Sequence, residues 1–158
     1  IDKWKIIKEK NEKIKLHFIG KLQSNKAKFA VKFFDYIHSL DSEKLASKIA
    51  EEQIKQNKKI KLFIQINIGS EDQKSGIKKE KIYEFYKYCK NLNLDVIGLM
   101  CIPPQNNDSK NYFSEMSRIN RDLNLTELSM GMSEDYLEAT QNNATFLRIG
   151  SKIFGQRD

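Results

Sequence analysis

Two short segments of this chain are almost entirely apolar, and they constrain its fold more than any other feature. Residues 62–68 read LFIQINI, and residues 96–102 read VIGLMCI. Strands that are buried on both faces have such near-continuous apolar sequences, whereas strands with one wet face alternate apolar and polar residues. The two segments therefore predict central strands of a parallel sheet that is covered by helices.

Four further segments have the composition of strands, and segments with helical periodicity lie between the strands. The six expected strands are Leu16–Ile19, Tyr36–Ser39, Lys61–Ile68, Val96–Ile102, Glu127–Ser129 and Thr145–Ile149. The expected helices are Asp2–Glu12, Ser42–Asn57, Lys79–Asn91, Ser109–Leu123 and Ser133–Gln141. No linker or low-complexity segment divides the chain. Alternating strands and helices predict one parallel α/β domain over residues 1–158.

Two of these helices have recognisable starts. Asp41 and Ser42 are cap candidates for the helix over residues 42–57, because short polar side chains accept hydrogen bonds from the first free backbone amides. The inward-facing residues expected for that helix are Leu45, Ile49 and Ile54. Ser133 is expected to cap the helix over residues 133–141.

Polar or flexible residues follow strand after strand, which favours a barrel over an open doubly wound sheet. They are Gln23-Ser24-Asn25, His38-Ser39, Asn67 with Gly69, Pro103-Pro104, Ser129-Met130-Gly131 and Gly150-Ser151. In (β/α)8 barrels the site is built after the carboxyl ends of the strands. The glycine-rich phosphate loops of doubly wound nucleotide-binding folds are not found in the sequence. Only six of the eight strands can be counted and the first residue is Ile1, so we expect two βα units to be missing and the sequence to start inside a longer protein.

Composition narrows the possible partners. The net charge is +7 and the pI is about 9.3, but the lysines are scattered and no arginine-rich helix or RNA-binding aromatic strand accompanies them. A solvated surface is therefore favoured over a specific nucleic-acid site. No run of 18 apolar residues predicts a membrane span. Cys89 and Cys101 have no disulfide or metal spacing, so we expect unpaired thiols in a reducing compartment, the cytoplasm.

The C-terminal segments predict a site for an anion. In TFLRIGSKIFGQRD, residues 145–158, Gly150 and Ser151 follow a strand that contains Arg148. Glycine lets backbone amides approach an anion, and barrels commonly bind phosphate in the loops after strands seven and eight. LSMGMS, residues 128–133, would bring Ser129 and Gly131 to the same anion.

Each of these residues also has a structural interpretation. Taken singly, Gly150 is a turn residue, Arg148 a surface or salt-bridging arginine, and His17 a structural histidine. Ser129 and Ser133 taken singly are helix-cap serines. The sequence contains neither a metal-ligand spacing nor a GxSxG motif, and these omissions disfavour a metal site and a serine hydrolase.

Five motifs together resemble the pyridoxal 5'-phosphate homeostasis proteins, the YggS/PROSC family. They are HFIGKLQSNK, QINIGSEDQKSGI, GLMCIPP, LSMGMSEDYLEA and FLRIGSKIFGQRD, in family order. The resemblance implies a (β/α)8 TIM barrel of the alanine racemase N-terminal-domain type, of which this chain supplies strands three to eight. It also implies that pyridoxal 5'-phosphate (PLP) is the cofactor. In the family an imine-forming lysine lies on the first barrel strand, which this chain does not contain.

The resemblance assigns roles to particular residues. Ser129, Gly150 and Ser151 would hold the phosphate, and Arg148 would lie near the pyridine nitrogen. His17, Asn25 and Met100 would line the pocket wall. An arginine at the pyridine nitrogen disfavours a protonated ring, which suits carrying the cofactor better than carbanion chemistry.

Three functions are compatible with these observations. The first is a PLP homeostasis protein that carries and releases the cofactor without a defined reaction, and that acts as a monomer when intact. The second is a PLP-dependent amino-acid racemase, which needs an acid or base on each face of the substrate carbon. In racemases an added β-domain supplies one of these groups, and we expect none after Asp158. The third is an unrelated phosphate-binding barrel enzyme or a nucleic-acid-binding module.

Overall fold

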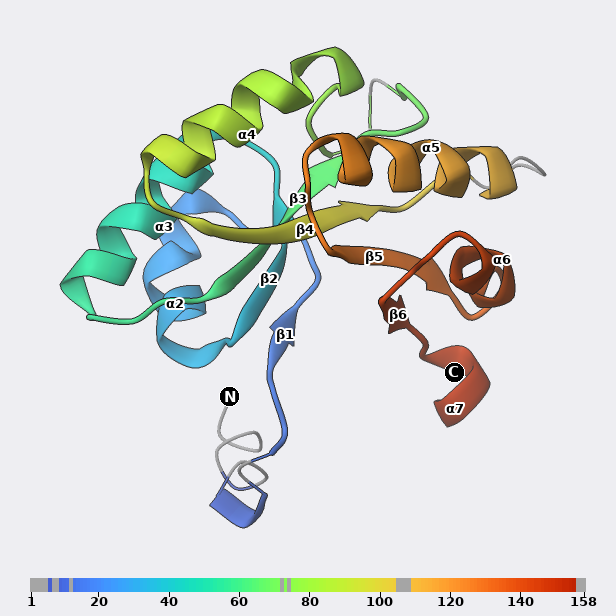
Figure 1. Cartoon of the computed structure of the whole chain (residues 1–158). Helices are drawn as coiled ribbons and strands as arrows, with labels where there is room; N and C mark the ends of the chain where they lie inside the picture. Colours follow the sequence, from blue (N-terminus) through green and yellow to red (C-terminus); the bar gives the residue numbers. More distant parts are fainter. Residues whose placement is uncertain are drawn as a thin grey trace.

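The sheet of this computed structural model has six parallel strands in sequence order (Figure 1). The structure describes residues 6, 9–11, 13–71, 73, 75–104 and 109–155. The strands are β1 (His17–Phe18), β2 (Tyr36–Leu40), β3 (Lys61–Ile66), β4 (Asp95–Cys101), β5 (Glu127–Met132) and β6 (Phe146–Arg148). Within the described ranges β1 and β6 are the two edges of this sheet. All six expected strands are confirmed, and they form one open sheet in sequence order.

Helices connect the strands along the outer side of the sheet, and one further short helix follows the last strand (Figure 1). They are η1 (Ser24–Lys26), α2 (Ala27–Phe33), α3 (Glu43–Lys55), η2 (Lys79–Lys81), α4 (Ile82–Asn91), α5 (Ser109–Asp122), α6 (Tyr136–Gln141) and α7 (Ser151–Phe154). Parallel neighbours need such crossovers, and right-handed crossovers place the helices on one side of the sheet. The expected helix Asp2–Glu12 lies largely outside the described residues.

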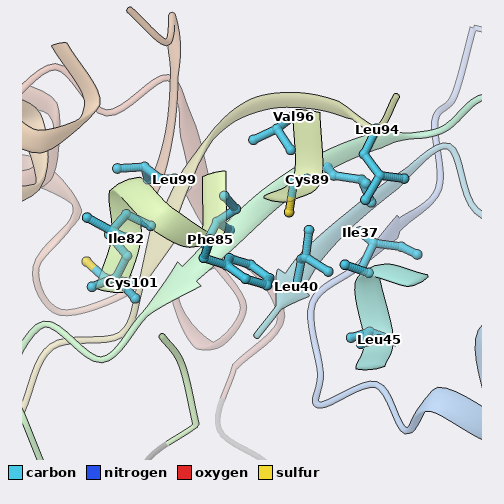
Figure 2. Packing of buried hydrophobic residues seen from close by; sticks show 14 of the residues in the cluster. Ile37, Leu40, Leu45, Ile82, Phe85, Cys89, Leu94, Val96, Leu99 and Cys101 are labelled. Carbon is cyan, nitrogen blue, oxygen red and sulfur yellow. The ribbon is translucent and has the colours of Figure 1, made fainter. Parts of the chain in front are cut away.

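The main apolar core fills the layer between the sheet and its helices. Figure 2 shows Ile37 and Leu40 of β2 beside Leu45 of α3 and beside Phe85 and Cys89 of α4. All five side chains are buried, at 3% exposure or less. Burial of this apolar surface holds the helices on the sheet and thereby fixes the positions of the strand ends.

Both cysteines are free, as the sequence predicts, and both are buried. Cys89 lies in α4, and Cys101 is the last residue of β4. Burial raises the pKa of each thiol to about 12, because the charged thiolate is poorly solvated in the interior.

Two helix predictions need correction. Ile54 is 82% exposed, although Leu45 and Ile49 are buried as expected. Ile54 follows Leu45 by nine residues, which is about half a turn out of phase in a helix with roughly 3.6 residues per turn. The predicted start at Ser42 is confirmed, since its hydroxyl accepts a hydrogen bond from Leu45 N at 3.4 Å.

Ser133 does not cap the helix that follows it. That helix, α6, begins at Tyr136 with Asp135 as its N-cap residue. The Asp135 carboxylate accepts a hydrogen bond from Met132 N at 2.6 Å and closes the turn before the helix. The Ser133 hydroxyl instead accepts hydrogen bonds from backbone amides after β6. In the part of the chain that the structure describes, no helix is long and apolar enough to cross a membrane.

Candidate functional site

Five aromatic rings gather on the inner side of the sheet, opposite the helices. His17 stacks on Tyr36 with centroids 4.2 Å apart, and His38 stacks on Phe63 at 4.3 Å. Phe146 of β6 meets Phe63 edge-on at 5.2 Å. Tyr36 and His38 are two residues apart in β2, which places both side chains on the same face of a strand. The rings join β1, β2, β3 and β6 into one rigid inner surface.

A chain of side-chain hydrogen bonds crosses this inner surface. His17 Nδ1 and His38 Nε2 are 2.9 Å apart, and His38 Nδ1 lies 2.7 Å from Ser129 Oγ. Arg148 donates from Nη1 to Ser129 Oγ at 2.8 Å. Its Nη2 donates to the Cys101 carbonyl oxygen, also at 2.8 Å. This hydrogen-bond chain therefore runs from β1 through β2 and β5 to β6. It ends on the Arg148 guanidinium, which is anchored by two acceptor oxygens.

The histidines of this chain are neutral at physiological pH. Burial, together with the neighbouring His17 and Arg148, lowers the pKa of His38 to about 3. Burial also lowers the pKa of His17, against an opposing effect of Asp35. Burial lowers the pKa of Arg148 as well, but a guanidinium keeps its proton at any ordinary pH. The Arg148 guanidinium is therefore a fixed positive charge next to neutral hydrogen-bonding groups.

Arg148 also lines an open cavity of about 1040 Å³ at the carboxyl ends of β4, β5 and β6. This is the edge at which parallel barrels build their sites. The Ser133 hydroxyl accepts hydrogen bonds from Gly150 N at 3.3 Å and from Lys152 N at 3.4 Å. It thus ties the loop after β5 to the loop after β6. The lining residues are Pro103, Pro104, Ser109, Met132, Ser133, Glu134, Asp135, Leu137, Glu138, Arg148, Gly150 and Ser151.

Most of the residues named from the sequence come together around Arg148. Gly150 and Ser151 line the same cavity. Ser129 is fully buried and hydrogen-bonded to Arg148, so it lies behind the guanidinium and not among the residues lining the cavity. Met100 is fully buried and pairs in register with Ser129. His17 reaches this group through His38.

Gly131 and Asn25 are placed differently. Gly131 has a φ of +91°, and a Cβ at this position would lie 2.5 Å from the Ala139 Cβ of α6. Close packing of α6 on β5 is therefore sufficient to require glycine here. Asn25 is exposed in η1 and is not among the residues that line the cavity.

Two residues of the site escaped the sequence interpretation. His38 stood out only as a polar residue at a strand end, and Ser133 only as a helix cap. The spacing of Tyr36 and His38 could have placed both on one strand face, but it could not show which distant strand they meet. Ser133 bonds to backbone amides 17 and 19 residues later in the chain, and no local pattern signals such a contact.

The comparisons with known proteins agree with this architecture. Residues 7–158 match the family model described as the N-terminal domain of alanine racemase. The pyridoxal phosphate homeostasis protein of Pasteurella multocida is 36% identical, and the alignment covers all of this chain and 72% of that protein. The solved structure of PipY from Synechococcus elongatus PCC7942 with PLP bound has a TM-score of 0.87 at 30% identity, over 96% of this chain and 75% of that chain.

A more distant likeness is to an alanine racemase from Clostridium difficile 630. Its TM-score is 0.70 at 16% identity, over 96% of this chain and 42% of that chain. Identity at this level shows the barrel fold alone. The family model, the Pasteurella relative and the fold agree, and this chain belongs to the family of pyridoxal phosphate homeostasis proteins, with six strands of a partial barrel of the alanine racemase N-terminal type.

Proposed function

We propose that this chain supplies the phosphate-binding loops and the ring-nitrogen contact of a PLP site, and that it acts in PLP homeostasis by holding and releasing the cofactor. The observation that carries the proposal is the placement of Arg148. Its guanidinium is anchored at two points on the wall of a cavity that Gly150 and Ser151 also line. A cation and an adjacent glycine–serine loop are what an anionic, ring-bearing ligand needs.

The loop after β6 fits a phosphate group. A Cβ placed on Gly150 would have no neighbour within 4 Å, so a ligand has open space to approach the backbone there. Ser151 is exposed and adds a hydroxyl donor. Ser133 holds the loop by accepting from two of its amides. The PipY relative was solved with PLP bound, which supports placing the same cofactor here.

Arg148 favours a carrier over a racemase. When bound, PLP supplies an aldehyde and a ring that can act as an electron sink, and the sink is strongest when the pyridine nitrogen is protonated. A guanidinium donates a hydrogen bond but does not give up its proton, so it leaves that nitrogen unprotonated. Racemisation needs the stronger sink and an acid or base on each face of the substrate carbon.

Two further features bear on how PLP is bound and on the compartment in which the protein acts. No lysine is among the described residues that line the cavity, and we therefore expect this chain to bind PLP noncovalently. Free, buried thiols at Cys89 and Cys101 suit a reducing compartment, and we infer the cytoplasm. We expect the intact protein to act as a monomer.

The test is a PLP titration of the chain, followed by absorbance and by equilibrium dialysis. Ser151→Ala and Arg148→Met should each weaken binding by roughly tenfold, because each removes a hydrogen bond to a charged or polar ligand group. Arg118→Met is the matched control, since Arg118 is an exposed arginine on α5 that pairs only with Asp122 among the described residues. Unchanged affinity in both site variants would show that the site lies elsewhere. Borohydride reduction followed by mass spectrometry should find no covalent adduct.

A further inference from the structure

We propose that His38 is a positioning residue that orients Arg148 through the Ser129 hydroxyl, and so sets the contact of Arg148 with the ring of a bound ligand. The effect on PLP rests on the proposed function, whereas the geometry does not. His38 is 2% exposed and does not line the cavity. It lies at the centre of the hydrogen-bond chain, between His17 and Ser129.

The direction of the hydrogen bonds follows from the number of protons available. Arg148 can only donate, so Ser129 Oγ accepts from Nη1 and has its own hydrogen left to donate. Ser129 is fully buried, and a buried hydroxyl without an acceptor is costly. His38 Nδ1 is the acceptor at 2.7 Å. A neutral His38 then carries its proton on Nε2 and donates it to His17 Nδ1 at 2.9 Å.

His38 itself has little freedom to move. Its ring stacks on Phe63 at 4.3 Å and meets Phe146 edge-on at 5.9 Å. Stacked and edge-on contacts hold an aromatic ring in one orientation. The two hydrogen bonds of the ring nitrogens also prevent the His38 ring from turning within its own plane. The acceptor nitrogen is therefore held in one place, and the Ser129 hydroxyl is held with it.

Arg148 depends on this arrangement because both of the acceptors that anchor it are neutral oxygens. They are Ser129 Oγ on β5 and the Cys101 carbonyl on β4. Two acceptors define the plane of a guanidinium, whereas one acceptor allows it to swing. The charge is not cancelled by either anchor, so it stays available to a ligand in the cavity. Loss of the His38 acceptor frees the Ser129 hydroxyl to rotate and weakens one of the two anchors.

This inference separates the ring side of the site from the phosphate side. The amides of Gly150 and Lys152, on either side of Ser151, donate to Ser133, which belongs to a different hydrogen-bond group. A change at His38 should therefore weaken PLP, which has a ring, and leave inorganic phosphate unaffected. A general loss of packing would weaken both ligands alike.

The experiment compares three variants in the full chain. His38→Phe keeps the stacked ring and removes both nitrogens. His38→Asn restores an acceptor at the place of Nδ1. Phe85→Leu is the control, because Phe85 is a buried aromatic residue of α4 in the outer apolar layer, on the opposite side of the sheet from the Ser129 bond. We expect His38→Phe to bind PLP roughly tenfold more weakly at unchanged phosphate affinity, His38→Asn to recover most of the loss, and Phe85→Leu to change neither affinity.

A double-mutant cycle with Arg148→Met supplies the decisive comparison. If His38 acts through Arg148, His38→Phe has no further effect on PLP affinity once Arg148 is gone. Additive effects, or an equal loss of phosphate affinity, would overturn the proposal. If the chain binds no PLP at all, the proposed function fails. The orientation of Arg148 by His38 is then tested by the Arg148 Nε–H resonance in NMR. That resonance should shift in His38→Phe and recover in His38→Asn, and an unchanged resonance would overturn the inference as well.

Discussion

The two faces of the sheet are built from different interactions. On β3, Ile64 points into the apolar layer under the helices, whereas Phe63 points to the inner side and stacks on His38. The outer layer is held by apolar contact. The inner layer adds directed hydrogen bonds that link His38, Ser129 and Arg148.

Neighbouring residues of one strand therefore contribute to the protein in different ways. Apolar burial is non-directional and stabilises in proportion to the area removed from water. A buried polar chain contributes through geometry and is costly when only one member is removed. Substitutions on the outer face should therefore change stability, and substitutions on the inner face should change stability and ligand binding together.

The largest expected effect lies on the outer face. Ile64→Ala removes a fully buried side chain between β3 and the helices, and we expect the free energy of unfolding to fall by about 2–5 kcal/mol. Urea unfolding at neutral pH measures the loss. PLP affinity of the folded fraction should stay unchanged. A large drop in affinity would mean that the two faces are not separable.

Next come the two glycines near the cavity. Gly131→Ala should destabilise the fold by about 2–4 kcal/mol, because the φ of +91° and the contact with Ala139 both oppose a Cβ. Gly150→Ala should change stability by no more than about 0.5 kcal/mol, since a Cβ there meets nothing. If phosphate approaches Gly150, the same change lowers PLP affinity. Thermal unfolding and a PLP titration distinguish the two positions, and equal destabilisation would contradict the structure.

The buried His38 of the inner face should make the free energy of unfolding depend on pH. The pKa of His38 is about 3 in the folded chain against 6.5 for an ordinary histidine. Between these values the unfolded chain binds a proton that the folded chain does not, so the free energy of unfolding falls as the pH drops below 6.5. The contribution of His38 is a loss of about 2 kcal/mol between pH 7 and pH 5. Urea unfolding of His38→Phe should lack this part of the loss, and identical pH profiles would contradict a neutral, buried His38.

The smallest expected effect on stability is at Ser133. This residue lines the cavity and links the loop after β5 to the loop after β6. Ser133→Ala removes the acceptor of Gly150 N and Lys152 N. Because Gly150 and Lys152 are exposed to water, stability should fall by only about 1 kcal/mol or less. PLP affinity should fall several-fold through the loosened loop. A stability loss as large as that of Ile64→Ala would place Ser133 in the structural core instead.

The strands and most helices could be read from local patterns. The continuous apolar runs predicted β3 and β4, and Ser42 marked the start of α3, because burial and capping leave their signature within a few neighbouring residues. Ile54 and Ser133 were misjudged for the opposite reason. The phase of a helix against the sheet and the choice of capping residue depend on contacts with other elements.

The site divides in the same way. Arg148, Gly150 and Ser151 lie within four residues of one another, so their shared loop was visible in the sequence. The link from His38 to Ser129 spans 91 residues and depends on the order and register of four strands. By itself the sequence determined the alternation of strands and helices, the family motifs and the loop beside Arg148. Only the tertiary structure decided that His38 meets Ser129 behind that arginine, because strand pairing, and not chain proximity, brings them within hydrogen-bonding distance.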